Sequence, residues 1–365
     1  MNSNRKVVGI LSMQRVLNYG SFLQAYALRQ LLLHVGADEV FFIDIKSGRP
    51  LPGYMPVKVT SRCVRVLRMF MTGRLPVKIR DMRFEKKMRA GIARNLSMLE
   101  LDARPANGFD VAVIGSDEVF NCCQVSSWGY TSQLYGNVPE AKKVISYAGS
   151  FGHTTHEQLV EFGLDREICE TMQTMAAISV RDRNSYEIVE TITGSKPEIH
   201  LDPVLIYGYE EEIVARNISY PLKYMVVYSY QGRINDKKEI KEIVSFAKSK
   251  ELRLISVFCR YDWCDEAVIP DTPFDVLAWF KGAEYIVTDT FHGTIFSVVT
   301  HRPFCTLIRD SNHQKLDFLL SMLSLCDRGC SDIGATLAKS IDYDSVEEIL
   351  RRERARAWEY LKREL

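Results

Sequence analysis

Residues 110–118 read DVAVIGSDE, and this stretch indicates the fold class. Its first five residues have the pattern of a strand buried on both faces, and a polar turn follows them directly. Strands of this kind belong to parallel sheets that are covered by helices. The same form recurs at residues 143–147 and 177–180, each time followed by polar turn residues and a helical stretch. This alternation of strands and helices predicts an α/β protein.

The alternation continues outward to both ends of the chain. A strand at residues 6–11 and a helix at residues 20–34 precede the central stretch, and a second series of strands begins at residue 224. Open parallel sheets bind ligands beyond the carboxyl ends of their strands. We therefore predict two Rossmann-like domains that face each other across a cleft, followed by a C-terminal helix. The predicted ranges are 1–205, 206–330 and 343–365.

Length and composition exclude several classes of protein. A chain of 365 residues corresponds to about two domains. Its 46% hydrophobic and 25% charged residues exclude a disordered, collagen-like or low-complexity chain. No run of 18 apolar residues occurs, and residues 1–14 lack the apolar core of a secretory signal. We therefore expect a cytoplasmic protein.

The cysteine pattern also favours a cytoplasmic protein. There are nine of them, an odd number, and no two have CxxC spacing. This pattern indicates neither a disulfide framework nor a zinc cage, so we expect reduced thiols.

The charge is balanced overall and uneven along the chain. Lys and Arg number 47 against 46 Asp and Glu, which argues against nucleic acid as a partner. Residues 58–94, however, hold twelve basic and two acidic residues with apolar residues among them. Such an insertion is typical either of peripheral contact with the inner face of a membrane or of a solvated helix whose apolar stripe packs on the core.

Two polar clusters lie where the predicted helices begin. Asn18 and Gly20 start the first helix, where free backbone N–H groups suit a phosphate or carboxylate. Asn18 is equally suited to cap that helix. Ser116 and Asp117 directly follow the buried strand at residues 110–114. An acid in that place can take a proton from a sugar hydroxyl, and it can also cap a helix.

Two further clusters follow the next strands. Ser146 opens a run of small residues, which either lets the backbone approach a ligand or forms a tight turn. Arg181 follows the strand at residues 177–180. A guanidinium there either binds a carboxylate or phosphate bidentately or forms a surface pair with Asp182.

The segment at residues 288–294, TDTFHGT, carries the most specific pattern. It joins a buried strand to a helix, which would place the ring of His292 in the cleft beside a helix N-terminus formed by Gly293 and Thr294. We expect Asp289 to orient that ring or to cap the helix. No grouping of His, Cys and Asp has the spacing of metal ligands, so no metal is predicted.

Together these blocks resemble the polysaccharide pyruvyltransferase family. The resemblance runs from about residue 8 to residue 320 and leaves out the basic stretch and the last helix. It is carried by NYGSFLQAYAL (18–28), VIGSDEVFN (113–121), ISYAGSFG (145–152), ISVRDRNS (178–185), HLDPVLI (200–206) and VTDTFHGTIFSVV (287–299).

The resemblance implies a GT-B-like arrangement of the two domains and a transferase. The enzyme would move the pyruvyl group of phosphoenolpyruvate onto a pair of sugar hydroxyls and form a pyruvate ketal. The acceptor would be a bacterial surface polysaccharide, in a capsule or exopolysaccharide, or its lipid-linked precursor. Phosphoenolpyruvate would be the donor substrate, with no separate cofactor.

The chemistry assigns roles to the matching residues. A site for phosphoenolpyruvate needs anion clamps, one acid and one base. His292, which matches the histidine of the family's FHG block, is the expected general acid or phosphate ligand. Asp117 is the expected base and Arg181 the expected anion clamp. Further substrate-binding positions are expected at Asn18, Gly20, Ser116, Ser146, Asp289, Gly293, Thr294 and Lys315.

One departure from the family pattern concerns the second anion clamp. Some relatives carry an additional Arg just before the histidine, where this chain has Thr290 and Phe291. We therefore expect the second clamp to come from Arg309 or Arg260.

Two other functions compete with this interpretation. A GT-B-like glycosyltransferase that uses a nucleotide sugar would need a ribose anchor in the second half, and no acidic residue there is a clear candidate. A catalytically inactive glycan-binding relative would retain the fold without turnover. The presence of His292, Arg181 and Asp117 argues against such a loss.

Overall fold

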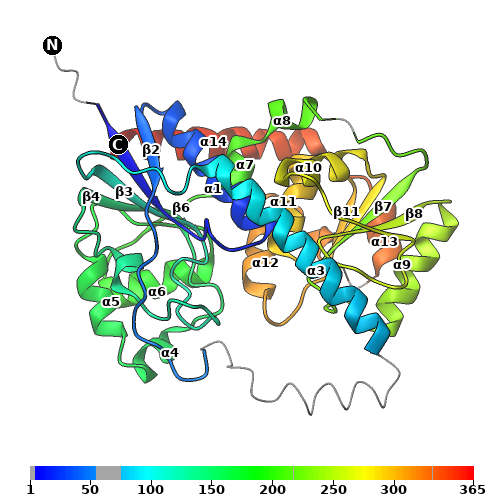
Figure 1. The fold of residues 1–365 in the computed structure, drawn as a ribbon, viewed down its shortest axis with the longest axis horizontal. Coiled ribbons are helices and arrows are strands. Elements are labelled where there is room, and N and C mark those ends of the chain that lie inside the picture. Colours follow the sequence, from blue (N-terminus) through cyan, green and yellow to red (C-terminus); the bar gives the residue numbers. More distant parts are fainter. Residues whose placement is uncertain (1–4, 55–74, 217, 331) are drawn as a thin grey trace.

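The computed structural model describes residues 5–54, 75–216, 218–330 and 332–365. In its first half, six parallel strands form one sheet in the order β2-β1-β3-β4-β5-β6 (Figure 1). The strands are β1 (Val7–Leu11), β2 (Glu39–Phe42), β3 (Phe109–Asp117), β4 (Ala141–Gly149), β5 (Ser179–Val180) and β6 (Glu198–Ile199).

The second half holds a separate sheet of five parallel strands in the order β11-β10-β7-β8-β9. Its strands are β7 (Tyr224–Tyr228), β8 (Arg253–Val257), β9 (Glu266–Val268), β10 (Tyr285–Thr288) and β11 (Phe304–Thr306). The prediction of an α/β chain with two Rossmann-like sheets is therefore confirmed. The predicted domain boundary at residues 205 and 206 falls within a short helix that packs on both halves.

Helices cover the sheets and connect them. They are α1 (Tyr19–His34), α3 (Leu75–Asn95), α4 (His156–Glu161), α5 (Asp165–Met172), α6 (Arg183–Thr193), α7 (Pro203–Tyr207), α8 (Glu210–Val214), α9 (Lys237–Ser249), α10 (Pro273–Gly282), α11 (Phe291–Val299), α12 (His313–Met322), α13 (Ile333–Ala338) and α14 (Tyr343–Glu364), with single 3₁₀ turns at Leu96–Leu99, Ser132–Tyr135 and Cys326–Arg328.

Helix α1 lies between the two sheets and brings its N-terminus to the cleft. Most of its residues are buried around the whole circumference, as expected for a helix enclosed by protein on all sides. It contacts β3 of the first half and α10 of the second. The ring of Phe22 packs edge-on against Phe274 of α10 at 5.9 Å between centroids. The first turn of α1 is therefore held where both halves can approach a ligand.

Helix α14 spans the two halves (Figure 1). At its start, the Tyr343 hydroxyl donates to the Arg302 carbonyl in the second half at 2.6 Å. Near its end, the Tyr360 hydroxyl donates to the Ser146 carbonyl of β4 at 2.7 Å. The C-terminal helix thus ties the second half back onto the first sheet.

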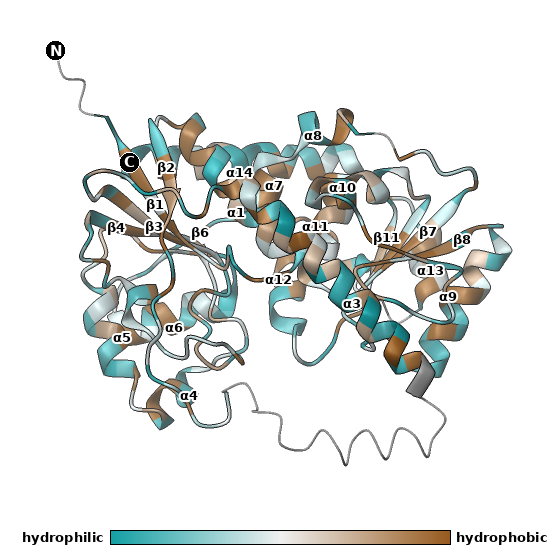
Figure 2. Ribbon diagram, viewed as in Figure 1, coloured by the Kyte–Doolittle hydropathy of each residue, from teal (hydrophilic) through white to brown (hydrophobic). Residues whose placement is uncertain are grey.

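Helix α3 carries the described part of the basic stretch. Residues 58–74 of that stretch lie outside the described residues. Figure 2 shows hydrophilic and hydrophobic residues mixed along α3. Met88 and Ile92 pack into the core, whereas Ile79 and Met82 are 40% and 60% exposed. Among the described helices, none combines the length and the apolar composition needed to cross a membrane.

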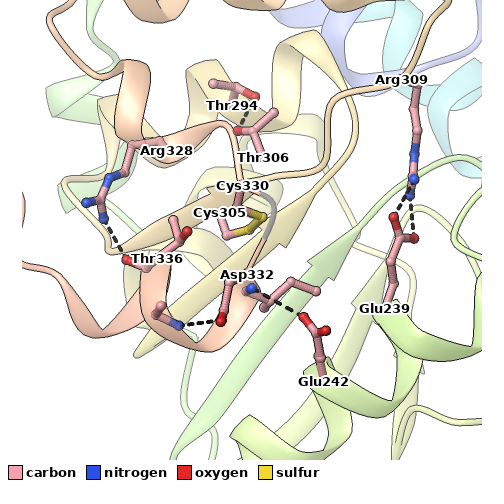
Figure 3. Close-up of a disulfide and its surroundings, with 12 residues drawn as sticks. Glu239, Glu242, Thr294, Cys305, Thr306, Arg309, Arg328, Cys330, Asp332 and Thr336 are labelled. Atoms are coloured by element: carbon pink, nitrogen blue, oxygen red, sulfur yellow. Dashed lines mark hydrogen bonds and ion pairs between the residues drawn. A yellow bond between two sulfur atoms is a disulfide. The ribbon is translucent and has the colours of Figure 1, made fainter.

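The expectation of reduced thiols is wrong for one pair of cysteines. Cys305 of β11 and Cys330 form a disulfide, with their Cα atoms 6.0 Å apart (Figure 3). The Cys330 N–H donates to the Thr306 carbonyl at 3.1 Å, which aligns the segment around Cys330 with β11. The two residues are separated by 25 positions in sequence, so spacing alone did not reveal the pair. Cys63 lies outside the described residues, and the other six cysteines are free thiols.

Candidate functional site

A cavity opens between the two halves, at the carboxyl ends of both sheets, and six predicted site residues line it. They are Asn18, Gly20, Asp117, Arg181, His292 and Lys315. The first four come from the first half and the last two from the second. This is the place where open parallel sheets bind ligands, because helix N-termini and strand-end loops converge there.

Arg181 lies at the floor of the cavity, directly after β5. Its side chain is 1% exposed, and its two terminal nitrogens donate to Asp202 at 2.8 Å and to Asp117 at 3.1 Å. The guanidinium carbon also lies 4.4 Å from the ring centroid of Phe291. Asp182 instead caps α6, accepting from the Ser185 N–H at 2.8 Å. Arg181 is therefore a buried ion-pair partner and not half of a surface pair.

Asp117 ends β3 and is ionised in this arrangement. Its second oxygen accepts from the Ser21 hydroxyl at 3.0 Å. Burial raises the pKa of Asp117, but the Arg181 guanidinium, the His292 ring and the Ser21 hydroxyl together outweigh burial, and the pKa falls below its usual value. The same carboxylates, Asp117 and Asp202, overcome the effect of burial on Arg181 and raise its pKa.

His292 sits in the first turn of α11, with its ring against the first turn of α1. A Cβ atom at Gly20 would lie 2.3 Å from the His292 Nδ1, so only glycine permits this approach. The Nε2 atom is buried, has no hydrogen-bond partner among the described residues, and lies 3.8 Å from Asp202 Oδ2. Burial lowers the pKa of His292, although Asp202 and Asp117 oppose the change. The imidazole is therefore neutral at pH 7 in this structure.

An ion pair crosses the cavity from one half to the other. Lys315 of α12 donates to Glu118 at 2.6 Å. Burial raises the pKa of Glu118, but Lys315, Arg181 and Asn121 together lower it more strongly, and the pKa falls to about 2. The Glu118 carboxylate also accepts from Asn121 at 2.7 Å. This pair joins the halves directly beside Asp117.

The other five predicted positions do not line the cavity. The Ser116 and Ser146 hydroxyls are buried and donate to the carbonyls of neighbouring strands. Gly293 is packed so closely that a Cβ would meet the Thr288 Oγ1 at 2.1 Å. The Thr294 hydroxyl donates to the Thr290 carbonyl of its own helix at 3.0 Å. These four residues hold the strand ends and the helix in place.

Asp289, the fifth position, does neither of the two tasks expected of it. The cap of α11 is Thr290, whose hydroxyl accepts from the Gly293 N–H at 2.9 Å. The carboxylate nearest to the His292 Nε2 is that of Asp202. Asp289 is fully buried and pairs instead with Arg233, at 3.1 Å.

The two arginines expected as a second anion clamp are occupied elsewhere. Arg309 donates both terminal nitrogens to Glu239, at 2.6 and 2.8 Å. Arg260 pairs with Asp81 of α3 at 3.2 Å and with Asp262 at 2.7 Å. Neither lines the cavity, so this expectation is wrong.

Sequence reasoning missed three charged residues of the site. Glu118 and Arg233 line the cavity, and Asp202 lies behind it as the partner of Arg181. Each of the three follows a strand of a parallel sheet: Glu118 follows β3, Arg233 follows β7 and Asp202 follows β6. Their position after strand ends is the sequence signal that marks them as site residues, because parallel sheets place their sites there.

In the described ranges, no group of three or more His, Cys, Asp or Glu side chains is placed to hold a metal ion.

Comparison with models of known protein families finds one family that matches this chain. A family model described as polysaccharide pyruvyl transferase matches residues 18–311. A search of curated proteins finds no match. Among solved structures, UGT89C1 of Arabidopsis thaliana complexed with quercetin is similar at 11% identity and a TM-score of 0.42, with 98% of this chain and 94% of that chain covered.

Two bacterial structures are similar to the same degree. MnaA of S. aureus with UDP has 10% identity and a TM-score of 0.47, with 97% of this chain and 91% of that chain covered. Heptosyltransferase WaaC of E. coli with ADP-2-deoxy-2-fluoro heptose has 12% identity and a TM-score of 0.38, with coverages of 95% and 99%.

Proposed function

The chain belongs to the polysaccharide pyruvyl transferase family, and on that premise we propose that it transfers the pyruvyl group of phosphoenolpyruvate to a sugar. The product would be a pyruvate ketal on a hydroxyl pair of a surface polysaccharide or of its lipid-linked precursor. One observation carries the proposal: an anion-binding guanidinium, a carboxylate and an imidazole, from Arg181, Asp117 and His292, meet in one cavity between the halves.

The reaction balances with these groups. Protonation of the methylene carbon of phosphoenolpyruvate creates a methyl group and an oxocarbenium-like centre at the adjacent carbon. A first sugar hydroxyl attacks that centre and loses its proton. A second hydroxyl then displaces the phosphate, and its proton leaves with the phosphate group. Two hydroxyls and one donor thus yield one ketal and one inorganic phosphate, with no change of oxidation state.

His292 is the proposed acid. Its Nε2 is buried and has no hydrogen-bond partner among the described residues. The neutral imidazole gains a proton when an anionic donor binds, because a phosphate or carboxylate beside the ring favours the charged form. The Asp202 carboxylate, 3.8 Å from Nε2, stabilises that imidazolium as well. Binding of the donor would in this way prepare the acid for the first step.

Asp117 is the proposed base. The Arg181 guanidinium keeps this carboxylate ionised and therefore ready to accept the hydroxyl proton. Ser21 and Arg181 hold one oxygen each, which fixes the direction in which the carboxylate faces the cavity. Arg181 would also supply positive charge near the donor's anionic groups.

Helix α3 is the proposed contact with an anionic membrane surface, where a lipid-linked acceptor would lie. Ile79, Met82, Arg83 and Lys86 follow one another at helical spacing, and all four are exposed. Apolar and basic side chains on one exposed helix face are typical of segments that bind a membrane interface.

The decisive experiment is an activity assay. The protein is incubated with phosphoenolpyruvate and a panel of candidate glycans and lipid-linked oligosaccharides. We expect release of inorganic phosphate together with an acceptor that has gained a pyruvate ketal, detected by mass spectrometry. Asp117→Asn serves as the matched control and should release phosphate at a rate lower by about 100-fold or more. Turnover with a nucleotide sugar, and none with phosphoenolpyruvate, would contradict the proposal.

A further inference from the structure

The cations that line the cavity are not equally available to a ligand. Three of them line it: Arg181, Lys315 and Arg233. Both terminal nitrogens of Arg181 donate to carboxylates, and the Lys315 ammonium donates to Glu118 at 2.6 Å. A donor that carries both a carboxylate and a phosphate needs positive charge that is not already neutralised. Arg181 and Lys315 can therefore meet only part of that need, because each is already paired with a carboxylate.

Arg233 differs from the other two. It lies in the loop between β7 and α9, and its side chain is 31% exposed. Its Nε is 3.1 Å from Asp289 Oδ2, and its guanidinium carbon is 5.6 Å from the ring centroid of Tyr230, which also lines the cavity. Among the described residues, none accepts a hydrogen bond from its two terminal nitrogens. These nitrogens are the bidentate donors that suit phosphate.

Asp289 explains why Arg233 is held in this place. The Asp289 side chain is fully buried, and neither of its oxygens accepts a hydrogen bond from a described residue. A buried carboxylate without hydrogen bonds depends on a nearby cation, and Arg233 is the closest one. Arg309 approaches the same oxygen only to 3.8 Å and gives its terminal nitrogens to Glu239. Asp289 thus holds Arg233 by an ion pair at Nε, and Arg233 lines the cavity.

We propose that Arg233 is the second anion clamp of this site and binds the phosphate group of phosphoenolpyruvate. The inference rests on the proposed function and names a residue that neither the sequence motifs nor the family match assigns. The phosphate is the leaving group, so its binding position must open to solvent. Arg233 meets that condition at 31% exposure, whereas Arg181 at 1% does not.

The test compares Arg233→Gln with Arg309→Gln in the full-length protein. Each substitution removes one positive charge near Asp289, but only Arg233 lines the cavity. Dissociation constants for phosphoenolpyruvate and for inorganic phosphate are measured by calorimetry. We expect Arg233→Gln to weaken both ligands at least tenfold and Arg309→Gln to weaken them less than threefold. Arg233→Lys, which keeps the charge and loses the bidentate geometry, should fall between the two.

Each other outcome is informative. If both Arg233 variants bind phosphoenolpyruvate and phosphate as tightly as the wild-type protein does, the inference is overturned. An equal loss of affinity in Arg309→Gln also overturns it, because such a loss would be a general effect of charge. Weaker binding of phosphoenolpyruvate with unchanged binding of phosphate overturns the phosphate assignment. A wild-type protein that binds inorganic phosphate through Arg233 but not phosphoenolpyruvate contradicts the proposed function instead. If Arg233→Gln does not fold, Arg233→Lys alone decides, and an unchanged affinity overturns the inference.

Discussion

His292 combines a buried ring nitrogen that has no described partner with two carboxylates nearby. Burial favours the neutral imidazole, and an added anion favours the imidazolium. A histidine so placed responds to a ligand's charge more strongly than a histidine in water would. This is the property that a general acid needs when it must gain its proton on substrate binding and lose it in the reaction.

Replacing His292 by Asn is expected to lower kcat/KM for phosphoenolpyruvate by about 100-fold or more, the usual contribution of a general acid. The pH profile gives a second readout. Because burial lowers the pKa of His292 from 6.5 and the protonated form is the active acid, kcat/KM of the wild-type protein should fall as pH rises through that lowered pKa and beyond. The variant should lose this dependence. Normal turnover in a folded His292→Asn protein would remove the imidazole from the mechanism.

Gly20 allows the first turns of α1 and α11 to approach each other closely. Its substitution by Ala should displace the His292 ring, because the new Cβ would lie 2.3 Å from Nδ1. We expect a loss of at least tenfold in kcat with little change in secondary structure by circular dichroism. The matched control is Gly91→Ala in α3, where the nearest atom is 3.8 Å away and alanine favours the helix by up to about 1 kcal/mol. A fully active Gly20→Ala protein would show that the ring position is not critical.

Helix α3 presents exposed apolar residues that its packing does not explain. Its last turns are anchored by Met88 and Ile92, and its earlier turns reach the second half through the ion pair of Asp81 with Arg260. Those contacts explain why the helix is held along the molecule. They do not account for Ile79 and Met82, which remain exposed beside basic residues.

Membrane contact through α3 can be tested with three substitutions. Arg83, Lys86 and Lys87 are exposed, and each basic residue near an anionic surface contributes about 1 kcal/mol to binding. Changing all three to Gln should weaken sedimentation with phosphatidylserine vesicles at least tenfold at low ionic strength, and added salt should reduce the difference. Changing Lys237, Lys241 and Lys248 of α9 to Gln alters the net charge equally and should have little effect. Equal losses in both triple variants would refute a specific role for α3.

In the whole molecule, the two halves are joined by contacts between residues that are far apart in sequence. Helix α14 links the second half to β4, and the pair of Lys315 with Glu118 links them across the cavity. His200 belongs to this assembly: its ring lies 4.7 Å from that of Tyr360 in α14 and 5.7 Å from that of Tyr147 in β4. Burial lowers the pKa of His200 to about 4.

The stability of the molecule should therefore depend on the protonation of His200. An unfolded histidine has a pKa near 6.5, so the unfolded chain takes up this proton first as pH falls. The stabilisation that comes from the neutral His200 is fully present above pH 6.5 and is lost as pH falls through about 4. The free energy of unfolding should fall by up to about 3 kcal/mol over that range. Urea unfolding of His200→Phe between pH 7.5 and 4.5 should show a flatter dependence than the wild-type protein. Identical slopes would contradict this assignment.

Local patterns predicted most elements because periodicity and capping act over a few residues. Thr272 caps α10 with a capping box to Asp275, and Pro273 occupies its first turn. The end of β3 was harder to predict. The strand continues past residue 114 to Asp117, since Gly115 and Asp117 pair with residues of β4. Strand pairing is a long-range contact, and a turn-like sequence does not reveal it.

The α/β class, the two sheets and the candidates Asp117, Arg181 and His292 could be inferred from the sequence alone, because buried strands and the polar residues that follow them are local patterns. Which charged groups meet depends on the folded arrangement of the two halves. It pairs Arg309 with Glu239 and leaves Arg233 facing the cavity, and it brings Cys305 beside Cys330. Ion pairs and disulfides depend on distances of a few ångströms between side chains remote in sequence, and only the packing of the two halves sets those distances.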